Sequence, residues 1–374
     1  MARRRVVIAG LGDSGLLTAI RLARFADVVG ISAKPGLVSG QELGTRLTRP
    51  ADWARDYFVP FDRYRGLDGV RTVQAELTGV DLAARVVYAE GPDGSRITEP
   101  FDSLVISTGV SNGFWRRPSM QSPAEVAAEL AVAHELLSAA GSVMVVGGGA
   151  AALSAAANIA GRWPAKIVDL YFPHERPLLG HHPRTWEHLQ RRLIRLGVGV
   201  HPGHRAVVPK GFACDAITAD PVQWSTGQAP ATADAIVWAI GKVRPNTDWL
   251  PDEVLDEDRF VSVTEELRVP GHRGVFAVGD VAATDPLRSS ARNRADAVLA
   301  HNVRAEPLGR RLRPYRPPRR RWGSVIGAQP DGLEVFAPSG HPVRIPAAVV
   351  DGLVMPWIVR RGMYRGVRTN HPLE

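Results

Sequence analysis

The sequence predicts an α/β protein made of two Rossmann-like dinucleotide-binding domains and a small C-terminal domain, on three observations. Two stretches place a group of glycines between an apolar strand pattern and an apolar helix pattern. These stretches lie far apart, one at the start of the chain and one beyond residue 141. The third observation is the length of 374 residues, which exceeds one ordinary core and predicts two or three domains.

The first unit begins with the apolar run Val6–Ala9, which is typical of a buried parallel strand. The turn after it has Gly-x-Gly-x-x-Gly spacing and carries Gly10, Gly12, Ser14 and Gly15. Glycines at this spacing suit a tight turn, a close approach by a pyrophosphate and the packing of helix on strand. The apolar pattern of Leu16–Leu22 predicts that helix, whose free N–H groups would face the phosphates.

The second strand of this unit is predicted over Asp27–Ser32. In dinucleotide folds, the end of this strand usually carries an acid that binds the adenosine ribose. Ser32 and Lys34 stand there instead, so we expect a hydroxyl and an amine to make these contacts. Residues 35–66 lack a regular pattern and are expected to form an ordered loop over the nucleotide. Residues 69–97 alternate as antiparallel strands do.

The second unit follows a further buried strand at residues 101–107. Its own first strand, Ser142–Val146, leads into a turn with Gly-x-Gly-x-x-Ala spacing that carries Gly147, Gly149 and Ala152. The unit continues with an alanine-rich helix, a strand at 166–172, a helix at 184–196 and a strand at 234–241. Two such turns, each after a strand and before a helix, indicate two dinucleotide sites rather than two structural turns.

The end of the chain is predicted to return to the first unit and then to become strongly basic. Gly274–Asp280 reads as a short buried strand, followed by a helix from about residue 289 to 303 and a stiff basic linker at 305–323. Residues 306–374 hold 12 Arg, no Lys and 5 acidic residues, which gives +7 of the total net charge of +8. Such a basic segment attracts anionic surfaces, whether lipid or nucleic acid.

Composition excludes several classes of protein. No run of eighteen apolar residues is present, so we expect no membrane-spanning helix, and glycines with Asp13 interrupt the run that would make a signal peptide. The single cysteine, Cys214, excludes an internal disulfide or a redox cysteine pair, is expected to be a bystander and fits a cytoplasmic protein. We expect no metal, because the histidine spacings match no standard zinc site.

Three phrases give the chain a family resemblance over about residues 5–305. Ile106–Phe114 and Trp238–Asn246 are similar to the two domain crossovers of the pyridine nucleotide-disulfide oxidoreductase superfamily, and Val278–Asp280 is similar to its final FAD motif. Within that superfamily the chain most resembles type II NADH dehydrogenases and the apoptosis-inducing-factor and ferroptosis-suppressor branch. The resemblance implies an FAD domain at 1–112 and 246–305, interrupted by an NAD(P)H domain at 113–245, with a basic segment at 306–374.

The resemblance also implies roles for individual residues. FAD would lie on the first glycine turn and near the following residues: Ser32, Lys34, Thr108, Gly109, Gly279 and Asp280, the last of which would bind the ribityl chain. NAD(P)H would lie on Gly147, Gly149 and Ala152, with Gly241 near the nicotinamide. The chemistry would be hydride transfer from nicotinamide to flavin. Arginines in the first turns of the next helix would either face the flavin or form a solvated surface: Arg288, Arg292 and Arg294.

The chain departs from the type II pattern at two places in the second unit. Ser154 stands where those enzymes have Glu, and Phe172 stands where an acid usually binds the NADH ribose. His174 and Arg176 are close by, and an arginine there accommodates a 2′-phosphate, which favours NADPH. A poor or lost nicotinamide site remains an alternative.

The expected function is an FAD-dependent NAD(P)H dehydrogenase that reduces a quinone or similar small acceptor without a disulfide. The alternatives are a soluble reductase of an acidic, ferredoxin-like partner, and a flavoprotein with mainly a binding role; nucleic acid is the less favoured partner, and a homodimer is left open. Residues 345–365 mix Trp, Tyr and Arg with apolar residues, as interfacial helices do. We expect them to dock on the inner face of the cell membrane, or else to pack on the flavin domain, with Pro356 and Gly362 breaking any long helix.

Overall fold

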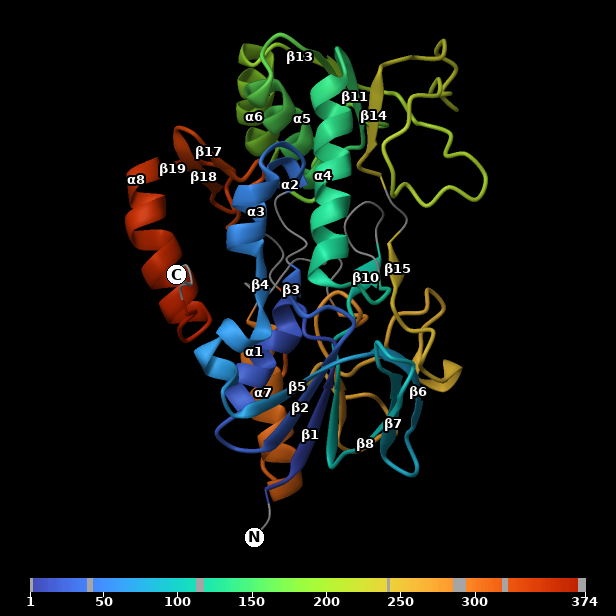
Figure 1. Ribbon diagram of the computed structural model, residues 1–374, viewed down its shortest axis with the longest axis vertical. Helices are drawn as coiled ribbons and strands as arrows, with labels where there is room; N and C mark the ends of the chain where they lie inside the picture. Colours follow the sequence, from blue (N-terminus) through green and yellow to red (C-terminus); the bar gives the residue numbers. More distant parts are fainter. Residues whose placement is uncertain are drawn as a thin grey trace.

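A five-stranded parallel sheet forms the lower lobe of the molecule (Figure 1). The computed structural model describes residues 3–38, 43–111, 118–240, 243–284, 294–317 and 322–368. Side chains alternate along the first strand, so Val6 and Ile8 pack toward the helices while Val7 and Ala9 pack toward an antiparallel sheet on the other face. The strand order is β16 (Val275–Ala277), β9 (Ser103–Ile106), β1 (Arg5–Ala9), β2 (Asp27–Ser32) and β5 (Val70–Gln74).

Each face of this sheet has its own cover. Two helices pack together on one face, α1 (Asp13–Leu22) and α7 (Ala295–Ala305). The antiparallel sheet on the other face consists of β6 (Glu76–Asp81), β7 (Val86–Glu90) and β8 (Arg96–Pro100). The predicted buried strands are found in the parallel sheet. The prediction of antiparallel strands over residues 69–97 is right for β6, β7 and the start of β8 but wrong for β5, which pairs in parallel with β2 at the edge of the main sheet.

A second parallel sheet, of four strands, forms the upper lobe (Figure 1). Its order is β13 (Val198–His201), β12 (Ile167–Tyr171), β11 (Ser142–Val146) and β14 (Ala235–Trp238). The helices of this lobe are α4 (Pro123–Ala139), α5 (Ala150–Arg162) and α6 (Pro183–Arg195). Loops that carry Phe212, Cys214 and Trp224 cover the opposite face. In each parallel sheet a glycine turn follows the first strand, β1 or β11, and leads into a helix. This arrangement confirms the predicted α/β class.

Residues 35–66 are not the loop that was expected, which corrects the sequence prediction. They form β3 (Gly36–Val38), α2 (Leu43–Thr48), α3 (Pro50–Tyr57) and β4 (Phe58–Pro60), with 3₁₀ turns η1 (Phe61–Arg63) and η2 (Arg65–Leu67) after them. Every described residue of α2 is buried, and Gly44 packs so closely on α5 that a Cβ there would lie 2.2 Å from the Ser154 carbonyl oxygen. Packing against a distant helix thus orders a segment without a strong pattern of its own.

The two lobes are joined by a short antiparallel ribbon. β10 (Val110–Ser111) pairs with β15 (Arg244–Pro245). The Asn246 side chain stabilises the ribbon with two hydrogen bonds. Its Nδ2 donates to the Thr108 carbonyl at 3.0 Å, and its Oδ1 accepts from the Ser111 hydroxyl at 2.7 Å. The ribbon brings together the two segments that the sequence singled out as crossovers. Residues 112–114, part of the first crossover phrase, lie outside the described residues.

The described residues 305–317 of the predicted basic linker pack on the lower lobe. After η5 (Glu306–Leu308), Asn302 of α7 bonds the backbone of Arg313 on both sides, donating to its carbonyl and accepting from its N–H at 2.8 Å each. The Tyr315 ring is buried in the core that α1 and α7 share. Hydrogen bonds and one buried ring therefore hold part of a segment that its sequence predicted to be a stiff basic linker.

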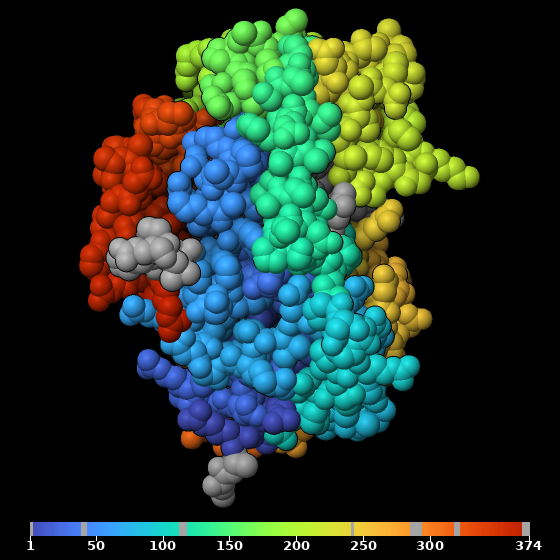
Figure 2. Space-filling view, in the orientation of Figure 1, coloured from blue at the N-terminus to red at the C-terminus, as the bar shows by residue number. Residues whose placement is uncertain are grey.

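The terminal segment contacts both lobes. It forms a small antiparallel sheet, a short helix and a π-helix: β17 (Ala328–Gln329), β18 (Gly332–Phe336), β19 (Pro342–Ile345), α8 (Ala347–Val349) and η6 (Val350–Met363). Ile326 and Phe336 enter the core of the upper lobe, whereas Tyr364 packs on that of the lower lobe. Figure 2 shows this segment, in red, on one flank beside α2 and α3.

The π-helix corrects the expectation that Pro356 and Gly362 would break the helix. Its wider turn, with hydrogen bonds from residue i to i+5, accommodates both residues within η6. Four large apolar side chains at the start of η6 and along it are exposed: Val349, Leu353, Trp357 and Ile358. Val349, Leu353 and the pair Trp357–Ile358 are spaced by about one helical turn, so the four lie on one side of the helix. We call them the apolar stripe. No helix in the described part of the chain is long and apolar enough to cross a membrane.

Candidate functional site

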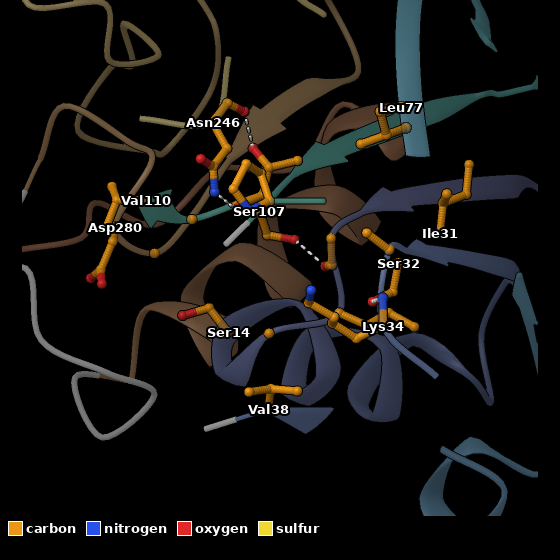
Figure 3. A pocket seen from close by; sticks show the side chains of 18 of the residues that line it. Ser14, Ile31, Ser32, Lys34, Val38, Leu77, Ser107, Val110, Asn246 and Asp280 are labelled. Atoms are coloured by element: carbon orange, nitrogen blue, oxygen red, sulfur yellow. Dashed lines mark hydrogen bonds between the residues drawn. The ribbon is translucent and has the colours of Figure 1, made fainter. Parts of the chain in front are cut away.

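The first cleft opens at the carboxyl ends of the parallel strands of the lower lobe, with an empty volume of about 1450 Å³ including the space open to solvent. Its walls come from the turns after β1, β2, β9 and β16 and from the residues beside β15. Figure 3 shows Ser14, Ser107, Asn246 and Asp280 around one part of the cleft, and Ser32 with Lys34 around another. Carboxyl ends of parallel strands are where α/β proteins bind nucleotides.

The three glycines of the first turn have three different environments. Gly10 has φ +97°, and a Cβ there would lie 2.5 Å from the Ser107 carbonyl oxygen. A Cβ on Gly15 would lie 2.0 Å from the Gly10 carbonyl oxygen, so this glycine permits the contact of helix with strand. Around Gly12 no atom lies within 4 Å of where a Cβ would stand. Gly12 therefore faces open cleft and leaves room for a ligand to approach the backbone.

Helix α1 starts at this open position without a side-chain cap. Gly12 is its N-cap residue, so no side chain satisfies the first N–H groups of the helix. These groups and the positive end of the helix dipole point into the cleft beside Ser14. The cleft, the uncapped start of α1 and the open space at Gly12 together fit a dinucleotide pyrophosphate, so the residues present fit FAD.

Ser32 and Lys34 both line this cleft at the end of β2, where the ribose acid is missing. The Ser32 hydroxyl accepts from the Lys34 backbone N–H at 3.2 Å. The Lys34 ammonium donates to the Ser119 carbonyl at 2.6 Å and to the Gln121 side chain. The cleft wall also includes Glu76 of β6, a carboxylate that the sequence analysis did not consider.

The crossover ribbon supplies another wall of the cleft. Thr108 and Gly109 line it, and the Thr108 hydroxyl donates to the Asn246 carbonyl at 2.7 Å. Asn246 and Trp249 also line it and were missed as site residues. Asn246 is the last residue of the second crossover phrase, Trp238–Asn246, so its sequence position could have identified it. Nothing in the local sequence of Trp249 marks it.

Gly279 and Asp280 line the cleft after β16. Gly279 has φ +83°, and its Cβ would lie 3.0 Å from the Ser14 hydroxyl, so the last strand and the first helix approach closely here. The following helix starts later than expected, at Ala295, so Arg294 is its N-cap residue rather than part of its first turn. Arg288 and Arg292 lie outside the described residues.

A second cleft, with an empty volume of about 1310 Å³ including open space, lies at the carboxyl ends of the upper sheet. Gly147 lines this cleft and has φ +150°. Gly149 is the N-cap residue of α5, without a side-chain cap, and no atom lies within 4 Å of where its Cβ would stand. Ala152 is fully buried behind this turn. The second turn thus repeats the geometry of the first, while Gly241 lies outside the described residues.

Of the other residues that the sequence singled out, Ser154 and Arg176 do not line this second cleft, whereas Cys214 does. The Ser154 hydroxyl is buried and accepts from the Gly44 N–H at 3.2 Å, so it joins α5 to α2. The Arg176 guanidinium donates to the carbonyls of Leu178 and Leu179 at 3.3 and 3.5 Å. Cys214, expected to be a bystander, lines the cleft, and burial followed by the Asp215 charge raises the pKa of its thiol.

The histidines are dispersed among different partners. His201 pairs with Asp169 at 2.8 Å, and His188 pairs with Glu334 at 3.2 Å. Among the described residues, no three His, Cys, Asp or Glu side chains are grouped so that they could hold a metal ion.

The sequence profile of the family described as pyridine nucleotide-disulphide oxidoreductase matches residues 4–304. Ferroptosis suppressor protein 1 of Xenopus tropicalis is 25% identical over 333 residues, which cover 84% of this chain and 83% of that protein. An NADH dehydrogenase-like protein of Mycobacterium tuberculosis is 27% identical over 314 residues, which cover 75% of this chain and 73% of that protein. The sulfide:quinone oxidoreductase of Aquifex aeolicus has the same fold, with a TM-score of 0.67 at 17% identity over 92% of this chain and 86% of that one.

The family match covers both glycine turns, both crossovers and the final Gly279–Asp280 turn. It therefore confirms the superfamily that the sequence phrases resemble. The chain belongs to the pyridine nucleotide-disulphide oxidoreductase family and is an NAD(P)H-dependent flavoprotein oxidoreductase, with FAD as cofactor and NAD(P)H as co-substrate.

Proposed function

We propose that this protein takes a hydride from NAD(P)H onto FAD and passes two electrons to a quinone or a similar small acceptor. In sum, NAD(P)H, a proton and a quinone give NAD(P)⁺ and a quinol. The protein supplies binding and orientation for this chemistry. The name of one protein of the same fold, a sulfide:quinone oxidoreductase, supports a quinone acceptor. The name of a similar protein, an NADH dehydrogenase-like protein, supports a reduced nicotinamide as the donor.

The observation that carries the proposal is that the two clefts meet at the crossover ribbon. Pro118 lines both of them. Val110 and Asn246 line the first cleft. Ser111, the next residue after Val110, and Arg244, two residues before Asn246, line the second. A nicotinamide entering from the upper lobe and an isoalloxazine entering from the lower lobe would therefore come together at one place, as direct hydride transfer requires.

The proposal assigns residues 1–112 and 246–305 to the FAD domain and 113–245 to the NAD(P)H domain. The sheet membership supports it, because β16 completes the first sheet after the whole second sheet has been formed by residues 142–238. Among the proposed contacts, the N–H groups at the start of α1 and Ser14 bind the FAD pyrophosphate, and Asp280 binds the ribityl chain. The start of α5 binds the pyrophosphate of NAD(P)H.

The proposal excludes a cysteine relay to the acceptor, because the chain has one cysteine. The acceptor must therefore approach the flavin itself. We further infer that the apolar stripe docks the protein on a membrane that holds the quinone, since the stripe is solvent-exposed and lies near a helix end with Arg360 and Arg361.

The test is anaerobic titration of the purified, flavin-loaded protein. We expect NAD(P)H to bleach the oxidised flavin absorbance and a short-chain quinone to restore it in stoichiometric amount. If NAD(P)H bleaches the flavin and only an acidic ferredoxin-like protein restores its absorbance, the protein is a soluble reductase and the quinone proposal is wrong. A flavin that neither nucleotide bleaches would refute both and leave a binding role.

A further inference from the structure

The outer end of the second cleft, beside β12 and β13, lacks the usual means of binding an adenosine ribose. Phe172 stands at the position of the ribose acid, but it is 1% exposed and packs edge-on against Trp186, with ring centroids 5.7 Å apart. The Arg176 guanidinium is engaged by two carbonyls of its own loop and does not line the cleft. Phe172 and Arg176 therefore present no free polar group there, and His174 does not line the cleft either.

Two other residues line this end of the cleft, His204 and Arg205, which follow β13. Their turn is fastened to the chain that follows β12. The Gly203 N–H donates to the His174 carbonyl at 3.2 Å, and the His204 N–H donates to the Phe172 carbonyl at 2.9 Å. Backbone hydrogen bonds therefore fix this turn at the place where the adenosine half of a dinucleotide would leave the sheet.

The Arg205 backbone is held from the opposite side as well. Its N–H donates to the Thr226 hydroxyl at 3.1 Å, and its carbonyl accepts from the Ser225 N–H at 2.8 Å. Its side chain is exposed and forms no ion pair with a carboxylate in the described part of the chain. Because the Arg205 backbone is already fixed and its guanidinium has no carboxylate partner to give up among the described residues, binding of an anion here loses little conformational entropy.

Stacked aromatic side chains pack against the His204 ring. Tyr171 stacks between His201 and Trp224, at centroid distances of 4.2 and 4.8 Å. His204 meets the edge of this stack, 5.1 Å from both Tyr171 and Trp224, and its Nδ1 bonds the Pro202 carbonyl at 2.8 Å. That hydrogen bond assigns the proton of the neutral ring to Nδ1 and leaves Nε2 for another partner.

We propose that His204 and Arg205, rather than His174 and Arg176, bind the 2′-phosphate of NADPH and so make the protein select the phosphorylated nucleotide. This inference rests on the proposed assignment of the second cleft to NAD(P)H. A guanidinium offers a phosphate two parallel hydrogen bonds. NADH has only a hydroxyl at this position and gains no such pair of bonds.

The test measures binding of 2′,5′-ADP and 5′-AMP to the flavin-loaded protein by titration calorimetry. The two fragments differ by the 2′-phosphate and carry no nicotinamide. We expect the wild-type protein to bind 2′,5′-ADP at least about tenfold more tightly than 5′-AMP, as charge-assisted hydrogen bonds imply. Arg205→Ala should abolish this difference, and Arg205→Lys, which keeps the charge, should recover part of it.

Arg176→Ala is the matched control, because it removes the same side chain from the other candidate position. It should leave the ratio of the two affinities unchanged, with thermal unfolding showing that each variant is folded. Equal affinities in the wild-type protein, no binding of either fragment, or a greater loss in Arg176→Ala would overturn the inference. Because no electron acceptor takes part, failure of quinone reduction with a preserved fragment ratio would refute the proposed function alone.

Discussion

Gly12 and Gly149 occupy equivalent places at the starts of α1 and α5, and neither has an atom within 4 Å of where a Cβ would stand. Their backbones are extended, which valine adopts readily, so Gly12→Val and Gly149→Val should both fold. In Gly12→Val the side chain enters the space of the FAD pyrophosphate. We expect that variant to be purified without flavin, as absorbance and extraction of the cofactor would show.

Gly149→Val serves as the counterpart. It should stay yellow but resist bleaching by NAD(P)H, since the valine would stand at the start of α5, two residues after Gly147 of the second cleft, and would leave the first cleft open. A Gly12→Val protein with a full complement of FAD would contradict the assignment of the first cleft.

Cys214 allows a second residue-scale prediction, because it is the one thiol of the chain and lines the second cleft. Burial, and then the Asp215 carboxylate, raise the pKa of its thiol, so little thiolate is present near neutral pH. Alkylation by iodoacetamide should be slower than that of free cysteine and should accelerate as pH rises. Saturating NADPH should slow it further, as intact-mass spectrometry would measure. Rapid alkylation at pH 7 without nucleotide protection would contradict this.

The sequence predicted those residues whose role follows from local spacing. The two glycine turns are complete within ten residues each, so their chemistry was visible in advance. That Asn246 lines the same cleft as Thr108 could not be predicted from local sequence, because the pairing of β10 with β15 brings their segments together. Arg176 was a reasonable candidate by position, but nearby carbonyls bind its guanidinium.

At the scale of elements, α2 depends on a partner 110 residues away in sequence. Gly44→Ala would place a Cβ 2.2 Å from the Ser154 carbonyl oxygen, and the two helices would have to separate. We expect a loss of about 1 to 3 kcal/mol in the free energy of unfolding, which denaturant titration would measure.

The matched control is Gly161→Ala in α5, where a Cβ meets no atom within 4 Å. That change should be neutral or should stabilise the protein by up to about 1 kcal/mol. Equal effects of the two substitutions would show that α2 does not pack as described. The same dependence explains why residues 35–66 could not be assigned from their sequence: α2 is buried by α5, and Trp53 of α3 is buried against Val126 and Leu130 of α4.

At the scale of the whole molecule, the terminal segment is a structural part of both lobes. Deleting residues 306–374 would remove Ile326 and Phe336 from one core and Tyr364 from the other, so truncation would test stability rather than docking. Surface substitutions are the sharper test of the membrane inference. Trp357 and Ile358 are 54% and 56% exposed, and replacing both by Ser should leave the fold intact.

We expect the Trp357→Ser, Ile358→Ser double variant to lose most of its co-sedimentation with anionic vesicles. The control replaces Val132 and Leu136, exposed apolar residues of α4, by Ser and should sediment like the wild-type protein. Wild-type binding should weaken with salt but persist, because salt screens the arginines and not the apolar contact. Equal sedimentation of all three proteins would refute docking by the stripe.

The pairing of β9 with β16 has a consequence for biosynthesis. These strands are neighbours in the sheet, yet residues 107–274 separate them in the chain. A ribosome adds about 5 to 20 residues per second, so β9 must wait on the order of ten to thirty seconds for its partner to emerge. During that interval the upper lobe can fold while the edge of the lower sheet stays unpaired, a state that invites aggregation or chaperone binding. Nascent chains should therefore capture FAD only after β16 has left the exit tunnel.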